Sequence, residues 1–226
     1  AMQNCEAALK LQPDQPLLLS DLGGLLCEQG KVEEGLVLFD RAIELDPNLA
    51  AARSNKGGVL TNIGRPDEAR AELIRALSLD PNNAAVRMNL AISMLLGGQF
   101  SQGWDAYEAG LSCGVREVAV RDFPRWEGQA LVGKSILVAA EQGLGDEIMF
   151  ASCLADLLAK ASPARCILEC DSRLAPLFAR SFPQLSILGE RNTQEASRIS
   201  AHLPIDFQIP IGSLPLYLRQ SAEDFP

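Results

Sequence analysis

The sequence predicts an α plus α/β protein, in which a helical solenoid precedes a domain built around a parallel sheet. Two observations predict this division. Before about residue 113, apolar residues recur at helical spacing inside a regular repeat, whereas after residue 134 short apolar runs of strand length alternate with helical segments. We therefore expect repeats over residues 1–113, a connecting segment over 114–134 and an α/β domain over 135–226.

Prolines mark the period of the first half. Pro13, Pro47 and Pro81 lie 34 residues apart, and each follows a segment of the form Ala-x-x-Leu that fits the end of a helix. The small residues Gly23 and Gly57 keep the same interval, so two helices of a repeat can approach closely there. A 34-residue period of helix pairs with this ending is typical of the tetratricopeptide repeat. We expect one partial repeat, two full repeats and a divergent last one.

A polar column follows the same interval, at Asp21, Asn55 and Asn89. An amide both donates and accepts hydrogen bonds, so such a column on the concave side of a solenoid is suited to an extended peptide backbone. The alternative is that these side chains only bridge neighbouring repeats. The column resembles the asparagine ladder that holds target peptides in O-linked N-acetylglucosamine transferase, with Asp21 in place of one asparagine. This resemblance implies a protein or peptide partner in the repeat groove.

The connecting segment contains Pro124, Trp126 and Gly128, a composition that favours an ordered crossing over a flexible linker. We expect Trp126 to anchor the two halves of the chain to each other.

The second half opens with a strand, a glycine turn and a helix. Ser135 to Ala140 is an apolar run of strand length, Gly143-Leu144-Gly145 forms the turn, and helical spacing begins at Asp146. This is the opening unit of a Rossmann-like parallel-sheet domain, in which ligands gather at the carboxyl ends of the strands. Three further strands are expected, over residues 166–170, 185–188 and 206–209.

The glycine turn does not complete a dinucleotide fingerprint, because Ile148 stands where the third glycine is required. Asp146 would also repel a pyrophosphate at the helix amino terminus. Two interpretations of Asp146 stay open. It caps the helix, or it acts as a general base that takes a proton from an attacking hydroxyl or amide, with the glycines allowing close approach.

Several motifs resemble those of bacterial tetratricopeptide proteins with a glycosyltransferase-like domain. They are Glu141-Gln142-Gly143-Leu144-Gly145-Asp146, Trp126-Glu127-Gly128 and Phe100-Ser101-Gln102-Gly103-Trp104. The Gly-Asp pair is similar to the one after the first strand of the heptosyltransferases, where the aspartate is the proposed base. The resemblance implies the N-terminal half of a GT-B fold, with Asp146 catalytic, Gln142, Gly143 and Gly145 binding substrate, and no metal.

The function expected from this resemblance belongs to a longer protein, of which the chain would be a piece truncated at both ends. That protein would transfer a sugar from a nucleotide-sugar to an acceptor, with the nucleotide-sugar bound mainly by a second domain and no other cofactor. The chain alone would be inactive. The alternative is a non-catalytic tetratricopeptide scaffold for protein–protein interaction.

The composition disfavours some classes of partner and indicates the cellular compartment. A net charge of −9 disfavours nucleic acid and anionic membranes, and no apolar run is long enough to span a bilayer. The six cysteines include no Cys-x-x-Cys pair and there is a single histidine, His202, so no zinc site is expected. Cys166 and Cys170 are expected to be buried in the core. A reducing, cytoplasmic setting fits this cysteine usage.

Overall fold

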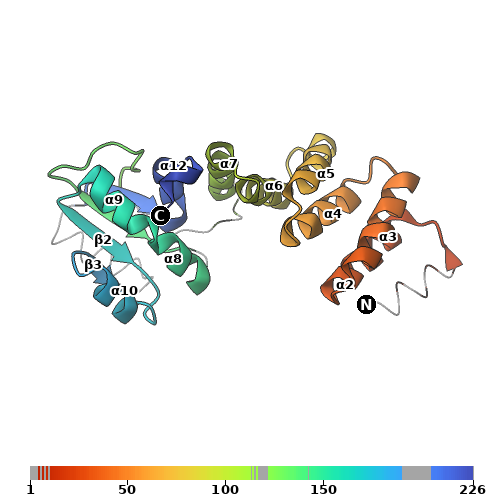
Figure 1. The fold of residues 1–226 in the computed structure, drawn as a ribbon, viewed down its shortest axis with the longest axis horizontal. Helices are drawn as coiled ribbons and strands as arrows, with labels where there is room; N and C mark the ends of the chain where they lie inside the picture. Colours follow the sequence, from red (N-terminus) through yellow and green to blue (C-terminus); the bar gives the residue numbers. More distant parts are fainter. Residues whose placement is uncertain are drawn as a thin grey trace. The chain divides into compact units, whose positions relative to one another are not determined.

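The structure is a computed structural model that describes residues 5, 7, 9, 11–112, 114, 116, 122–141, 143–189 and 205–225. The chain divides into two compact units, Ala1–Gly110 and Leu111–Pro226, which are considered separately (Figure 1). None of the helices in these described ranges is both long enough and apolar enough to cross a membrane.

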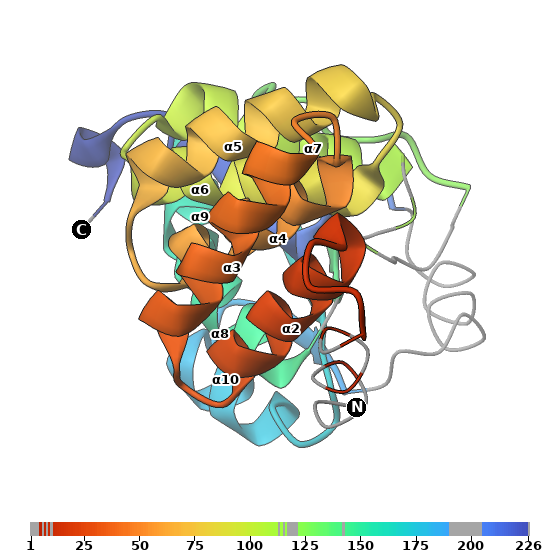
Figure 2. The same ribbon diagram turned by 90° about the vertical axis from the view of Figure 1, so that its right-hand side faces the viewer.

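The first unit is a series of helix pairs. Neighbouring helices of a pair lie side by side, as Figures 1 and 2 show for α2 with α3 and for α4 with α5. The bounds are α2 Pro16–Glu28, α3 Val32–Leu45, α4 Ala50–Asn62, α5 Pro66–Leu79, α6 Ala84–Leu96 and α7 Phe100–Ser112. The predicted period is therefore confirmed as a repeated pair of helices.

Local sequence signals set these helix ends. Pro16 and Pro66 occupy the first turn of α2 and α5, where a missing N–H is harmless. The turns inside the three pairs each place a glycine at positive φ, at Gly30 (83°), Gly64 (75°) and Gly98 (75°). A residue with a side chain is strained in this left-handed conformation, which is why glycine recurs there at the repeat interval.

The core of the first unit runs from one helix pair into the next. Phe39, Leu60 and Leu73 are at most 1% exposed and belong to a single buried cluster that also includes Leu36, Ala69, Ala76 and Val86. Small residues allow the close packing, as predicted: a Cβ atom placed on Gly23 would lie 3.0 Å from the carbonyl oxygen of Gly35. Each pair thus buries its apolar face against its neighbours rather than alone.

The second unit contains a four-stranded parallel sheet. Its strands are β1 Ser135–Ala139, β2 Arg165–Glu169, β3 Ser186–Leu188 and β4 Phe207–Pro210, in the order β3-β2-β1-β4. β1 is buried along its whole length and pairs with two strands, since Leu137 is in register with Ile167 of β2 and with Gln208 of β4. Four parallel strands follow the expected positions closely, because strands buried on both faces read as continuous apolar runs.

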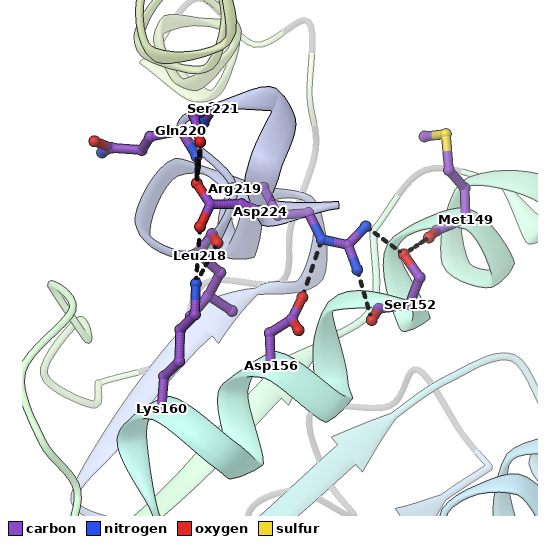
Figure 3. A network of polar contacts seen from close by, with 9 residues as sticks. All are labelled: Met149, Ser152, Asp156, Lys160, Leu218, Arg219, Gln220, Ser221 and Asp224. Atoms are coloured by element: carbon purple, nitrogen blue, oxygen red, sulfur yellow. Dashed lines mark hydrogen bonds and ion pairs between the residues drawn. The ribbon is translucent and has the colours of Figure 1, made fainter. Parts of the chain in front are cut away.

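Helices connect and flank these strands. They are α8 Leu144–Ala151, α9 Cys153–Ala161, α10 Ala175–Ser181 and α12 Leu214–Leu218, with the short 3₁₀ helices η1 Ile211–Ser213 and η2 Ala222–Asp224. The end of α12 and the residue after it form hydrogen bonds and an ion pair with α9 and the residue before it, through the side chains of Arg219 and Lys160 (Figure 3). Arg219 donates from Nε to Asp156 (3.0 Å) and from both Nη atoms to Ser152 (2.9 Å each), and Lys160 donates to the carbonyl oxygen of Leu218 (2.9 Å).

The connecting segment is part of the second unit. Trp126 is 1% exposed, its ring lies 5.3 Å from that of Tyr217, and its backbone N–H donates to the carbonyl oxygen of Gln208 in β4 (2.9 Å). Arg125 forms a parallel bridge with the same residue. Trp126 therefore anchors the connecting segment to β4 and α12 within this unit, and its role as an anchor between the two halves stays a prediction.

The amino ends of β1 and β4 are joined through the carboxylate of Asp206. One of its oxygens accepts from the backbone N–H of Ser135 (2.8 Å) and from its hydroxyl (3.0 Å), and the other accepts from Lys134 (3.0 Å). These donors, the backbone N–H above all, lower the pKa of Asp206.

We expect the free energy of unfolding of the second unit to depend less on pH in Asp206→Asn than in wild type. A carboxyl whose pKa is lowered by folding stabilises the fold above its unfolded pKa, and this contribution is lost as the pH falls through the folded pKa. Urea midpoints measured between pH 7 and pH 2 should therefore show wild type above Asp206→Asn at pH 7 and the two converging in acid. The change Glu127→Gln, at an exposed carboxylate, is the control. A constant gap across the pH range would contradict the expectation.

Candidate functional site

A groove of about 800 Å³ is present on the first unit. It is lined mainly by the first helix of successive pairs, α2, α4 and α6, and all three residues of the predicted polar column lie in it. Its lining includes Ser20, Asp21, Gly24, Leu25 and Glu28 of α2, Ser54, Asn55, Gly58, Val59 and Asn62 of α4, and Ala85 and Asn89 of α6. The repeat interval thus brings Asp21, Asn55 and Asn89 into one concave surface.

One residue of the column, Asn55, bridges neighbouring repeats, which is one of the two roles expected for the column. The Nδ2 of Asn55 donates to the hydroxyl of Ser20 in the preceding pair (3.2 Å), and Ser20 is fully buried. An amide offers two N–H donors and a carbonyl oxygen with two lone pairs, so this bridge uses one of its four hydrogen-bonding capacities. Asn89 is half-buried, with its Nδ2 near Gly58, where an added Cβ would be 3.3 Å away. Peptide binding by this column stays a prediction.

The second candidate lies at the carboxyl edge of the sheet. Because β1 is flanked by β2 on one side and β4 on the other, the chain connections diverge there, which is where open parallel sheets bind ligands. Asp146 is in the first turn of α8, and its Oδ2 accepts from the backbone N–H of Gly143 (3.0 Å). The capping interpretation of Asp146 therefore describes a bond that the structure contains.

The catalytic interpretation of Asp146 stays a prediction. Its side chain is half-buried, and Gly143 and Gly145 are exposed beside it. A Cβ atom added to Gly145 would meet nothing within 4 Å, so the backbone of α8 is open at that residue. Gln142, the fourth expected residue of this site, lies outside the described residues.

An ion pair that the sequence did not predict spans the ends of β1 and β4. The Nη2 of Arg116 donates to both carboxylate oxygens of Glu141, at 2.7 Å and 2.9 Å, and to the hydroxyl of Ser213 at 3.2 Å. The side chains of Arg116 and Glu141 are 0% exposed. Gly212 is required next to them, because a Cβ atom there would overlap the carboxylate of Glu141. The sequence did contain one signal: a glutamate directly after a buried strand needs a partner.

A second buried carboxylate supports the same edge. Glu147 of α8 is 0% exposed, and its Oε2 accepts from the backbone N–H of Asp171 after β2 (2.9 Å). The two adjacent acidic residues of α8 thus have different surroundings, since Asp146 caps the helix whereas Glu147 fixes α8 to the neighbouring strand end.

The described cysteines of this unit, Cys153, Cys166 and Cys170, are buried. Cys166 and Cys170 are buried, as predicted, at 2% and 0% exposure. Burial raises the pKa of the Cys166 thiol to about 12 and that of Cys153 to about 11, so neither forms a thiolate at neutral pH. Within the described part of the chain, no three His, Cys, Asp or Glu side chains are grouped so as to hold a metal ion.

Comparison with known proteins bears on the first unit most directly. Residues 59–112 match a family model described as tetratricopeptide repeat. The chain is 32% identical over 239 aligned positions to the protein FlbA of Caulobacter vibrioides; the match covers 100% of this chain and 40% of FlbA. The chain thus spans well under half the length of that relative.

Two solved structures show a weaker likeness to this chain. MamA from Desulfovibrio magneticus RS-1 has a TM-score of 0.46 and 21% identity, over 50% of this chain and 63% of that one. An O-GlcNAc transferase mutant from Thermobaculum terrenum has a TM-score of 0.44 and 17% identity, over 100% of this chain and 45% of that one. The matched family model and the helix pairs on a 34-residue period together identify this chain as one that carries tetratricopeptide repeats.

Proposed function

We propose that the first unit binds an extended segment of a partner protein in its groove. The observation that carries this proposal is the placement of Asp21, Asn55 and Asn89 along one groove, on the first helices of three successive pairs. An extended backbone offers an N–H and a C=O at every residue, and side-chain amides at regular intervals match both. Recognition of this kind depends on backbone shape and tolerates varied partner sequences.

The amide of Asn89 gives the cleaner test, because Asn55 also bonds to Ser20. A hydrogen bond contributes about 0.5–1.5 kcal/mol, so two bonds from one amide correspond to roughly a tenfold change in affinity. We therefore expect Asn89→Ala to weaken binding about tenfold. The exposed Asn48, which is not among the groove-lining residues, provides the control Asn48→Ala.

The measurement is a selection from a displayed library of random 12-residue peptides on the 226-residue chain, followed by fluorescence anisotropy with the enriched peptides. Peptides that bind wild type and Asn48→Ala equally, and Asn89→Ala more weakly, support the proposal. Enriched peptides that bind all three proteins alike, or the absence of enrichment, would overturn it.

A second function is proposed for the longer protein, namely transfer of a sugar from a nucleotide-sugar to an acceptor. The observation that favours it is the half-buried Asp146 in the first turn of α8, after exposed glycines at the carboxyl edge of the sheet. We propose that the second unit is the Rossmann-like, acceptor-side half of a GT-B glycosyltransferase, with Gln142, Gly143 and Gly145 contacting the acceptor. The motifs that resemble the heptosyltransferases support this assignment.

In this proposal one carboxylate oxygen of Asp146 caps α8 and the other acts as the general base. Oδ2 keeps the bond from Gly143, and Oδ1 takes the proton of the acceptor hydroxyl or amide. The acceptor atom then forms its bond to the anomeric carbon of the sugar, and the nucleoside diphosphate leaves with the electron pair of the broken bond. The donor is held by a further domain of the longer protein.

Asp146→Asn in the full-length protein tests this function. An asparagine retains an oxygen that caps α8 but does not act as a base, so we expect transfer to fall about a hundredfold while the unfolding midpoint stays the same. Glu127→Gln serves as the surface control. Equal transfer by wild type and Asp146→Asn would remove Asp146 from the mechanism, and no transfer by the full-length protein would leave the scaffold function alone.

A further inference from the structure

Two glycines line the groove of the first unit. Gly24 of α2 and Gly58 of α4 both line the groove and are separated by the repeat interval. A Cβ atom added to Gly24 would meet nothing within 4 Å, so the space above it is open. The corresponding residue of the third pair is Ile92, whose side chain is 37% exposed. The groove is therefore bare backbone at Gly24; at Gly58 the Nδ2 of Asn89 lies 3.3 Å from where a Cβ atom would be, and Ile92 is not among the residues that line the groove.

The charges of the groove lie at its α2 end. Among the described residues that line it, Asp21 and Glu28 are the charged ones; both are exposed and both belong to α2. The described lining residues include no lysine, arginine or histidine. Asp21 and Glu28 lie seven residues apart, two helical turns, and so share one face of α2, about 10 Å apart along the helix axis. A cation near Asp21 is thus within about one Debye length of Glu28 as well.

We infer that the segment bound in this groove carries a lysine or arginine that pairs with Asp21, with its backbone lying over Gly24. This inference rests on the proposed binding of a partner segment and adds its chemistry and direction. Charge complementarity selects the basic segment, because an acidic one would meet two carboxylates without a compensating cation. The bare backbone at Gly24 lets an extended chain approach closely, as glycine does where a ligand meets the fold.

The position of the basic residue follows from the spacing of the helices. α2 contacts α4, and α4 contacts α6. Packed helices lie about 8–10 Å apart and an extended chain rises about 3.3 Å per residue, so each repeat spans about three residues of the segment. Asp21 and Asn89 are two repeats apart, at opposite ends of the column. The basic residue should therefore stand at one end of a core of about six residues, and not at its centre.

Three variants test the inference with the same random 12-residue library and the complete 226-residue chain. Asp21→Asn gives the first pair the residue that the other two already have, so it removes the charge and keeps a hydrogen-bonding side chain. Gly24→Leu fills the open space on a helix surface, where leucine is a better helix former than glycine. Asn89→Ala reports on the proposed backbone recognition, independently of charge.

The expected result has three parts. Peptides enriched on wild type carry lysine or arginine at one fixed end of the shared core, and their affinity falls when salt is raised. Asp21→Asn binds such a peptide about fivefold more weakly, but binds the peptide with that lysine changed to glutamine as wild type does. Gly24→Leu unfolds at the same or a higher urea concentration than wild type and binds the peptides at least tenfold more weakly.

The outcomes separate the two proposals. Peptides that require Asn89 but show no basic preference, or an Asp21→Asn variant with unchanged preference, would overturn the inference and leave the proposed function standing. Wild-type affinity in a stable Gly24→Leu variant would also overturn it, because the backbone would then lie elsewhere. Failure to enrich any peptide whose binding depends on Asn89 would overturn the proposed function itself.

Discussion

Replacement of Glu141 by alanine is expected to destabilise the second unit by about 3–5 kcal/mol. The side chains of Glu141 and Arg116 are both fully buried, and a single guanidinium nitrogen reaches both carboxylate oxygens. Removing one partner of a buried ion pair leaves the other charge in a medium that solvates it poorly, which costs more than the pair itself contributes. The loss should be large because Gly212 brings the backbone against the carboxylate, so the site is closely packed.

The measurement is urea unfolding followed by the fluorescence of Trp126, which is buried in the second unit. The chain has a second tryptophan, Trp104 in α7, so the experiment is made in a Trp104→Phe background. Glu127→Ala, at an exposed position, should stay within about 0.5 kcal/mol of the parent. An effect of Glu141→Ala as small as that of the control would mean that the pair is not buried as described.

A double variant separates the pair from the space that it fills. Arg116→Met with Glu141→Leu removes both charges and keeps much of the apolar volume. Buried ion pairs replaced in this way often lose little stability, so we expect the double variant to be more stable than either single one. The Oγ of Ser213, which accepts from Arg116, is the remaining polar group of the cluster.

The repeats could be predicted because each repeat packs its helices in the same way and therefore needs similar residues at equivalent positions. The turn glycines, the small residues at Gly23 and Gly57, and the polar column all recur at one interval, so a single correct alignment fixes many positions. The parallel strands were predictable for another reason: a strand buried on both faces has to be apolar throughout, and β1 is.

Contacts between distant segments could not be predicted in the same way. Arg116 and Ser213 are 97 residues apart, and only the strand order β3-β2-β1-β4 brings the segments that carry them to one edge of the sheet. The packing of Trp126 against Tyr217 could not be predicted for the same reason, since nothing local shows that β4 forms beside the connecting segment. In the groove, the column was predictable from its period, whereas the open floor at Gly24 depends on which face of α2 is turned inward.

The substitution Gly35→Ala is expected to destabilise the first unit by about 2–3 kcal/mol, although alanine is the better helix former. Helix propensity alone favours alanine by about 1 kcal/mol. In the structure, however, a Cβ atom on Gly35 would lie 2.5 Å from the carbonyl oxygen of Gly23, and it would also overlap the sulfur of Cys27. A backbone oxygen has no side-chain rotation by which to move away, so α2 and α3 would have to separate. Ala69 holds the same position in the next pair and is fully buried there.

Gly24→Ala is the matched control on the opposing helix. It makes the same chemical change one residue from Gly23, but its Cβ meets nothing within 4 Å, so it should stabilise the unit by about 0.5–1 kcal/mol. Both variants are compared by urea unfolding followed by circular dichroism at a helical wavelength. If Gly35→Ala is as stable as Gly24→Ala, then α2 and α3 do not meet backbone to backbone at Gly23. Opposite signs for the two glycines would show that the helix interface, and not propensity, decides which residue this position accepts.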